Sequence, residues 1–332
     1  MLQSDSLGAV ARCATLLARI GVAGEVLAAE PLTGGVSSDL FRVQLTDRLL
    51  CVKFACEQLR VADQWVAPVR RSRTEYDWLT LIGRRFPAAV PALLGYDDEA
   101  HGFAMAFLPP ETHPPWKARL LAGTIDRAVA EAVGGLLGAM HAATAGNDEL
   151  RRHFAAKQDF RALRLEPYLQ RTADRNPAVA PALQALAAEL DRAQVALVHG
   201  DVSPKNILCG PRGPVLLDAE CAVYGDPAFD AAFCLTHLVA KAVHAPARRA
   251  ALLAAGGALW RAYRAAIDWE PAEQVEARVA RLLPALALAR VDGKSPLEYL
   301  NMDQRQKLRA NALALFARPL RRAERMMAEL AR

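Results

Sequence analysis

The sequence predicts an α+β fold of two lobes, a small N-terminal lobe built on an antiparallel β-sheet and a larger, mainly helical C-terminal lobe. Three observations support this prediction. The 332 residues are too many for one small hydrophobic core. Short segments of alternating apolar residues gather in the first third of the chain. Longer segments with apolar residues every three or four positions dominate the rest.

The N-terminal lobe should begin with a helix and continue as a meander of strands. Apolar spacing predicts a helix over residues 7–21 that ends at Gly21. Three strands follow, with a glycine-containing turn at their first bend, and a second helix and a strand pair complete the lobe. We expect these elements at residues 25–32, 40–45, 49–55, 71–86 and 93–111.

The C-terminal lobe should be largely helical. Residues 124–144 carry a long apolar stripe, and residues 178–190 predict another helix ahead of a short strand. Asp226 directly before Pro227 marks a further helix start. A helix that ends near residue 292 and an amphipathic helix over residues 303–330 complete the prediction.

Composition argues against several classes of function. The net charge of +5 is spread along helices, and aromatic residues make up only 6% of the chain, too few for a base-stacking platform. No stretch approaches eighteen apolar residues without a charge. The first residues, MLQSDSLGAV, lack the features of a secretory signal, and the six cysteines show no metal-ligand spacing. We therefore expect a cytoplasmic protein with neither nucleic acid nor membrane as a partner.

The most informative segment is residues 199–218, HGDVSPKNILCGPRGPVLLD. Phosphoryl transfer needs a group that aims the attacking hydroxyl and ligands for the metal ions that neutralise the phosphates. Asp201 would aim the hydroxyl. Asn206 matches the Asp-to-Asn spacing of a kinase catalytic loop, and Asp218 ends an apolar run where a metal-binding Asp is expected. The segment therefore predicts a phosphotransferase.

A structural explanation exists for each of these residues taken singly. An Asp after a Gly is common in turns, and the tripeptide HGD occurs by chance in many chains. The joint pattern of His199, Asp201, Asn206 and Asp218 is far more restrictive. Its order of strand, loop, strand and acidic end favours the functional interpretation.

These residues resemble the aminoglycoside phosphotransferase and choline kinase family, small-molecule kinases with a protein-kinase-like fold. The family's loop typically reads HGDLHPGN, and its metal strand ends like IDWE or LDFE. Here Ser203 replaces the usual His, Lys205 stands where Gly is common, and the strand ends in LLDAE. The resemblance implies ATP and Mg²⁺ as cofactors, Asp201 as the catalytic base or aligner, and Asn206 and Asp218 as metal ligands.

The same resemblance implies supporting roles around the loop. Glu220 would be an acid in the substrate cleft, and Ser203 leaves open which substrate group is met at its position. His199 is expected to order the loop through hydrogen bonds instead of acting as the base. Asp230, inside an apolar helix, is expected to be buried and to brace the loop.

In the N-terminal lobe the resemblance implies a nucleotide site. Gly35, Ser37 and Ser38 would cover the phosphates, although hairpins also need glycine for geometric reasons. Lys53 would hold the α- and β-phosphates, while its place in an alternating strand also suits an outward-facing lysine. Glu75 would pair with Lys53, or would form a capping box at the start of its own helix.

The connector between the lobes follows the last strand of the sheet in this family. We place a nucleotide-binding lobe at residues 1–107, a hinge at 108–112, and a catalytic and substrate-binding lobe at 113–332. Backbone groups of Ala106, Phe107 and Leu108 are expected to bind adenine. Backbone recognition leaves little trace in a sequence, so ATP instead of GTP follows from the resemblance alone.

The acceptor is the least defined part of the prediction. Arg290, Asp292 and Lys294 lie at a helix end, in the region that binds acceptors in related enzymes. Their mixed charge suits a polyol, a sugar or a carboxylate-bearing alcohol better than a cation, although the same residues suit a plain turn. We expect a small-molecule alcohol as the partner of a monomer or homodimer. Sugars, amino alcohols and aminoglycoside-like alcohols stay open.

Two alternatives come from other functional classes. A protein kinase is disfavoured because the metal strand ends in DAE instead of DFG and no A-P-E follows. A catalytically silent nucleotide-binding regulator is disfavoured because Lys53, Asp201, Asn206 and Asp218 are all present.

Overall fold

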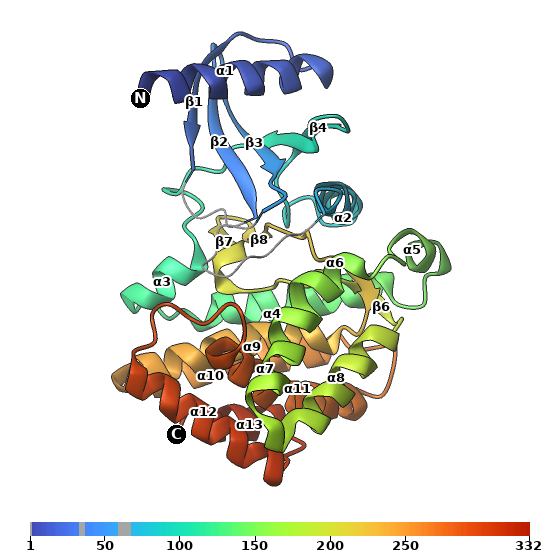
Figure 1. The fold of residues 1–332 in the computed structure, drawn as a ribbon, viewed down its shortest axis with the longest axis vertical. Coiled ribbons are helices and arrows are strands. Elements are labelled where there is room, and N and C mark those ends of the chain that lie inside the picture. The colour runs from blue at the N-terminus through green and yellow to red at the C-terminus, as the bar shows by residue number, and fades with distance from the viewer. Residues whose placement is uncertain (1, 33–36, 59–67) are drawn as a thin grey trace.

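The computed structural model, which describes residues 2–32, 37–58 and 68–332, has the two lobes expected from the sequence (Figure 1). The smaller lobe holds helix α1 (Leu2–Arg19), helix α2 (Arg71–Arg85) and an antiparallel sheet. Its strands are β1 (Val26–Pro31), β2 (Ser38–Leu45), β3 (Leu49–Ala55), β4 (Leu93–Asp97) and β5 (Gly102–Ala106). They are hydrogen-bonded in the order β1-β2-β3-β5-β4.

The two faces of the sheet belong to two different cores. α1 lies across one face, where Leu50, Val52 and Phe54 of β3 pack with it in a separate apolar cluster (Figure 1). Because side chains alternate along a strand, Cys51 points to the opposite face, and it joins α2 in the main core of the protein. Lys53 lies two positions after Cys51, so its side chain points to the same face as that of Cys51. Its ammonium is therefore directed toward the α2 side of the sheet.

The larger lobe is mainly helical. Its longer helices are α3 (Trp116–Ala122), α4 (Arg127–Thr144), α5 (Asp148–His153), α8 (Ala180–Arg192), α9 (Ala228–His244), α10 (Arg249–Ala265), α11 (Ala272–Asp292), α12 (Met302–Ala317) and α13 (Ala323–Leu330). The shorter pieces are α6 (Gln158–Phe160), α7 (Arg171–Arg175), and the 3₁₀ turns η2 (Pro177–Val179), η3 (Pro204–Asn206) and η4 (Pro246–Arg248). A ten-residue π-helix, η1 (Arg161–Gln170), lies between α6 and α7.

Two short antiparallel strand pairs hold the segment that carries the predicted catalytic residues. β6 (Ala196–Val198) pairs with β9 (Val223–Gly225). β7 (Ile207–Gly210) pairs with β8 (Gly213–Leu216). The loop at 199–206 therefore connects two anchored strands, and Figure 1 shows β7 and β8 at the junction of the lobes.

One expected element differs from the structure. The single helix predicted over residues 303–330 is two helices, α12 and α13, with a break after Ala317. Pro319 causes the break, because proline cannot donate the backbone hydrogen bond that a continuing helix needs and disfavours helical geometry in the residue before it. Among the helices that the structure describes, none is long and apolar enough to cross a membrane.

Candidate active site

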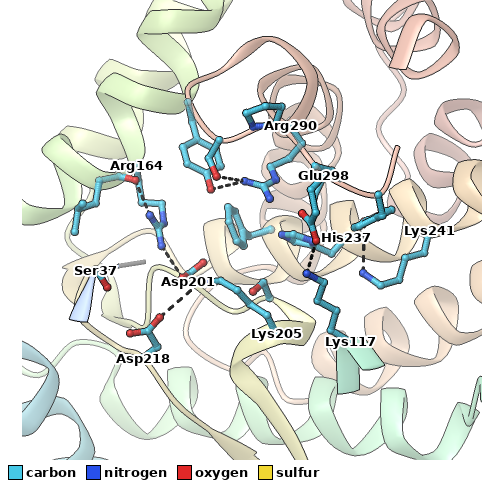
Figure 2. Close-up of a pocket in the computed structure, with 18 of the residues that line it drawn as sticks. Ser37, Lys117, Arg164, Asp201, Lys205, Asp218, His237, Lys241, Arg290 and Glu298 are labelled. Atoms are coloured by element: carbon cyan, nitrogen blue, oxygen red, sulfur yellow. Dashed lines mark hydrogen bonds and ion pairs between the residues drawn. The ribbon is translucent and has the colours of Figure 1, made fainter. Parts of the chain in front are cut away.

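A cavity of about 290 Å³ lies at the loop of residues 199–206 (Figure 2). Ser37 lines it from the smaller lobe, and Asp201, Ser203 and Lys205 line it from the loop. Further lining side chains come from α3, η1, α9, α11 and the chain between α11 and α12. The cavity thus collects residues that are far apart in the sequence.

The loop conformation requires a glycine at position 200. Gly200 has a φ of +80°, and a Cβ atom there would stand 2.6 Å from the carbonyl oxygen of Cys221. Any other residue would suffer both a left-handed backbone and a steric clash. Gly200 therefore sets the direction in which Asp201 leaves the loop.

Asp230 is hydrogen-bonded to the backbone of this loop, which fits the bracing role expected for it. Its fully buried carboxylate accepts hydrogen bonds from the backbone N–H groups of His199 (2.8 Å) and Gly200 (2.9 Å), and His141 Nε2 lies 3.2 Å away. Burial alone would raise the pKa of Asp230, but the hydrogen bonds with His141 and with the backbone of His199 outweigh it and lower that pKa. The carboxylate is thus held as an anion that fixes the loop backbone.

His199 orders the loop instead of serving as a base. Its Nδ1 accepts a hydrogen bond from the backbone N–H of Asp201 (3.1 Å), so the ring proton lies on Nε2, which donates to the carbonyl of Leu217 (3.1 Å). Burial lowers the pKa of His199 and keeps the ring neutral. These hydrogen bonds fit the expected structural role of His199, which stays a prediction.

The loop brings the three predicted catalytic and metal-binding residues together. Asn206 Nδ2 donates to Asp201 Oδ2 (2.8 Å) and to the Asp201 carbonyl oxygen (3.0 Å). The ammonium of Lys205 lies 3.3 Å from Asp201 and 3.6 Å from Asp218. Figure 2 shows Asp201, Lys205 and Asp218 converging at one end of the cavity. Both carboxylates therefore lie within reach of one cation.

Asp218 adopts a conformation that few residues tolerate. Its φ of +69° lies in the left-handed region, where Asp is among the least penalised residues other than Gly. Burial alone would raise the pKa of Asp218, but Lys53 and Lys205 outweigh it and hold the pKa well below its usual range. Such backbone outliers cluster at functional sites.

Lys53 and Glu75 form the predicted ion pair. Lys53 Nζ lies 2.6 Å from Glu75 Oε2 and 2.6 Å from Asp218 Oδ1. Burial alone would lower the pKa of Lys53, but the two carboxylates outweigh it and raise the pKa. No side-chain cap is formed at the start of α2, so the alternative of a capping box for Glu75 is wrong for the residues that the structure describes.

The other residues predicted for the nucleotide lie along the smaller lobe. Ser37 lines the cavity, and Ser38 is buried at the start of β2. Gly35 lies outside the described residues. Ala106 ends β5 and donates its N–H to the carbonyl of Ala92 (2.8 Å), and Phe107 and Leu108 follow it toward α3. The adenine-binding role of these three positions stays a prediction.

The residues predicted for the substrate divide into two groups. Ser203, Glu220 and Arg290 line the cavity, and Glu220 also pairs with Arg71 of α2 (2.9 Å). Asp292 does not line it, which corrects the prediction for that residue. Its carboxylate accepts hydrogen bonds from Arg309 of α12 (3.0 Å) and from Asn176 (3.1 Å), so it joins helices in place of facing a ligand.

Several lining residues were missed from the sequence. Arg164 of η1 forms an ion pair with Asp201 (2.9 Å), and Tyr168 follows it four residues later on the same π-helix. His237 and Lys241 lie four residues apart on α9. The sequence did hold a signal for this second pair. α9 is mainly apolar and is buried from Ala228 to Val243, and polar side chains in such a helix need a partner or a function.

A sequence model of the phosphotransferase enzyme family (APH) matches residues 28–266 of the chain. This match spans both lobes and includes the complete loop and metal-strand segment. A search of curated proteins finds no significant match.

Solved structures of kinases share the fold. A choline/ethanolamine kinase family protein from Mesorhizobium loti is 19% identical, with a TM-score of 0.59 over 100% of this chain and 99% of that chain. An amicoumacin kinase, solved with AMP-PNP and Ca²⁺, is 14% identical, with a TM-score of 0.54 over 91% of this chain and 87% of that chain. An aminoglycoside phosphotransferase from Alicyclobacillus acidocaldarius is 14% identical, with a TM-score of 0.50 over 96% and 94%.

Proposed function

Because the chain belongs to the phosphotransferase enzyme family, we propose that it transfers the γ-phosphate of ATP to a hydroxyl group of a small molecule. The observation that carries this proposal is the arrangement of Asp201, Lys205 and Asp218 around one end of the cavity, next to the buried pair of Lys53 and Glu75. Phosphoryl transfer depends on positioning and on neutralising charge, and this end supplies both.

The reaction follows from the residues at that end. Asp201 would accept the proton of the acceptor hydroxyl while the acceptor oxygen bonds to the γ-phosphorus. The bond between that phosphorus and the β–γ bridging oxygen breaks, and ADP leaves. Arg164, paired with Asp201, would fix the carboxylate, and Lys205 would neutralise charge on the transferred group. Lys53, held by Glu75, would bind the α- and β-phosphates.

The donor set fits Mg²⁺. Asn206 and Asp218 offer an amide oxygen and a carboxylate, and Mg²⁺ in kinases is typically bound by one or two protein ligands together with phosphate oxygens. Among the described residues no group of three or more His, Cys, Asp or Glu side chains is placed to hold a metal ion. Bound Mg²⁺ would neutralise the phosphates during transfer.

The shape of the cavity favours a small acceptor over a protein segment. Residues 295–299, between α11 and α12, line it, and its volume of about 290 Å³ lies at the lower end of the range for small-molecule sites. A protein kinase is therefore not favoured. A cytoplasmic location and a monomeric or homodimeric state stay predictions from the sequence.

A coupled assay of ADP release tests the proposal. Wild-type protein with Mg²⁺ and ATP is screened over sugars, sugar acids, amino alcohols, nucleosides and aminoglycosides, and mass spectrometry identifies a phosphorylated product. Asp201→Asn and Asp218→Ala should abolish acceptor-dependent release. Tight ATP binding without transfer to any acceptor would instead support the silent regulator.

A further inference from the structure

The cavity has two chemically different ends. The end at Asp201 and Asp218 belongs to the reaction described above. The opposite end, which we call the distal end, is formed by Lys117, His237, Lys241, Arg290, Glu298 and Tyr299 (Figure 2). In Figure 2 the labelled basic side chains of this end point into the same space. An acceptor whose hydroxyl meets Asp201 would place its remaining groups there.

Lys241 is a buried cation without a carboxylate partner. Its residue is only 2% exposed, and no Asp or Glu of the described chain forms an ion pair with it. Its ammonium lies 3.5 Å from the hydroxyl of Tyr299 and 4.9 Å from the centre of that ring. Burial, reinforced by the charge of Lys117, lowers the pKa of Lys241 to about 7. Proteins rarely bury an ammonium unless something pairs with it.

Other polar atoms around the cavity also lack partners among the described residues. They are the Oγ atom of Ser203, the Nε2 atom of His237 and the Nε atom of Arg290. Arg290 is held in place through Nη1 by the hydroxyls of Tyr168 (2.8 Å) and Ser295 (3.1 Å), which are neutral. Buried polar groups normally have partners, so several unpaired ones lining one cavity indicate a polar ligand.

The charges at the distal end do not cancel. Glu298 is the carboxylate among the residues that define this end, and Lys117 already occupies it at 2.5 Å. Neither Lys241 nor Arg290 forms an ion pair with a carboxylate in the part of the chain that the structure describes, and the charge of Glu298 is shared with Lys117. A cationic acceptor would bring its charge against both, at a high electrostatic cost in a confined site.

We propose that the acceptor is a small alcohol carrying a carboxylate or phosphate group, with its hydroxyl at Asp201 and its anion at Lys241 and Arg290. This inference rests on the proposed phosphotransferase function and narrows it to one substrate class. A guanidinium and an ammonium together suit an anionic oxygen group, the first through paired N–H donors and the second as a point charge. Ser203 and His237 would bind the polar body of the acceptor between the two ends.

Matched pairs of acceptors test the charge requirement. The pairs are gluconate with glucitol, glycerate with glycerol, and glycerol 3-phosphate with glycerol, and choline, ethanolamine and kanamycin supply cations. Initial rates of ADP release give kcat/KM for each compound. At least one anionic member should exceed its neutral counterpart by about ten- to hundredfold, as for one charge-assisted contact, and the cations should give no transfer. Comparing the carboxylate-bearing acceptors with the phosphate-bearing acceptor shows which of the two anionic groups the protein accepts.

Substitutions identify the residues on which the preference for anionic acceptors depends. Lys241→Met and Arg290→Met should each lower the ratio of anionic to neutral kcat/KM about tenfold or more, whereas Lys307→Met, on the exposed surface of α12, should leave it unchanged. A direct measurement accompanies this one. Inorganic phosphate, added at constant ionic strength, should raise the melting temperature of the wild-type protein more than that of Lys241→Met.

The outcomes separate this inference from the proposed function. Equal or faster turnover of neutral or cationic alcohols would overturn the inference and leave the phosphotransferase intact. The same holds if ATP is bound and hydrolysed but no anionic alcohol is phosphorylated, or if phosphate stabilises both proteins equally. Failure to bind ATP at all would instead overturn the proposed function.

Discussion

Replacing Lys241 with methionine should stabilise the ligand-free protein, by an amount that depends on pH. Burial and the neighbouring charges of Lys117 and Arg290, opposed by Cys234 and Glu298, lower its pKa from 10.5 to about 7. This lowering corresponds to about 5 kcal/mol of destabilisation. Because the folded pKa is the lower one, the penalty is complete below pH 7 and shrinks as pH rises toward 10.5. Methionine keeps the side-chain length and removes the charge.

The gain should therefore be about 5 kcal/mol at pH 6 and about 2 kcal/mol at pH 9. Urea unfolding of the wild type and of Lys241→Met at both pH values measures it, with Lys307→Met as a surface control that should change stability by less than about 0.5 kcal/mol. A gain of equal size at both pH values, or a loss at pH 6, would refute the conclusion that burial destabilises this ammonium.

Three further substitutions address the catalytic loop. Asp201→Asn should lower kcat at least about a hundredfold in the ADP-release assay because the proton acceptor is lost, and it should also lower the melting temperature because the buried Arg164 loses its anionic partner; activity within about fivefold of wild type would contradict its role. Gly200→Ala should cost more than about 2 kcal/mol in urea unfolding, since it adds a clash to a left-handed backbone, whereas Gly135→Ala, with open space around a helical position, should add about 1 kcal/mol. Asp230→Asn should cost about 3 kcal/mol at pH 7, because an amide cannot accept from both loop N–H groups and His141 as the anion does. Equal stability of wild type and Asp230→Asn would show that the brace is not needed.

The sequence was most informative where local chemistry decides the structure. Alternation in β3 and helical spacing after Arg71 predicted elements that the structure contains, and the pattern around Asp201 predicted which side chains meet. Spacing could not choose between two roles for Glu75, because both need the same residue at the same place. In the folded protein β3 lies against α2, which places Lys53 beside Glu75, and the two form the ion pair.

The distal end could not be read from the sequence because it is assembled from distant segments. Lys117, Lys241 and Arg290 belong to three different helices, and only packing brings them to one cavity. Asp292 illustrates the opposite error. It is two positions from Arg290, but a turn of about 200° around a helix directs it to Arg309 instead. The helix that ends near residue 292 was predicted correctly, whereas the direction in which the Asp292 side chain points was not.

Helix α2 ties the sheet to the rest of the molecule through three separate contacts. Arg71, fully buried, pairs with Glu220, the ring of Trp78 packs edge-on to that of His199 at 4.8 Å, and Glu75 holds the lysine that reaches Asp218. If the sheet unfolded alone, several buried charges would lose their ion-pair partners at once. Calorimetry should consequently record a single melting transition, with equal calorimetric and van't Hoff enthalpies, in place of stepwise melting of two halves.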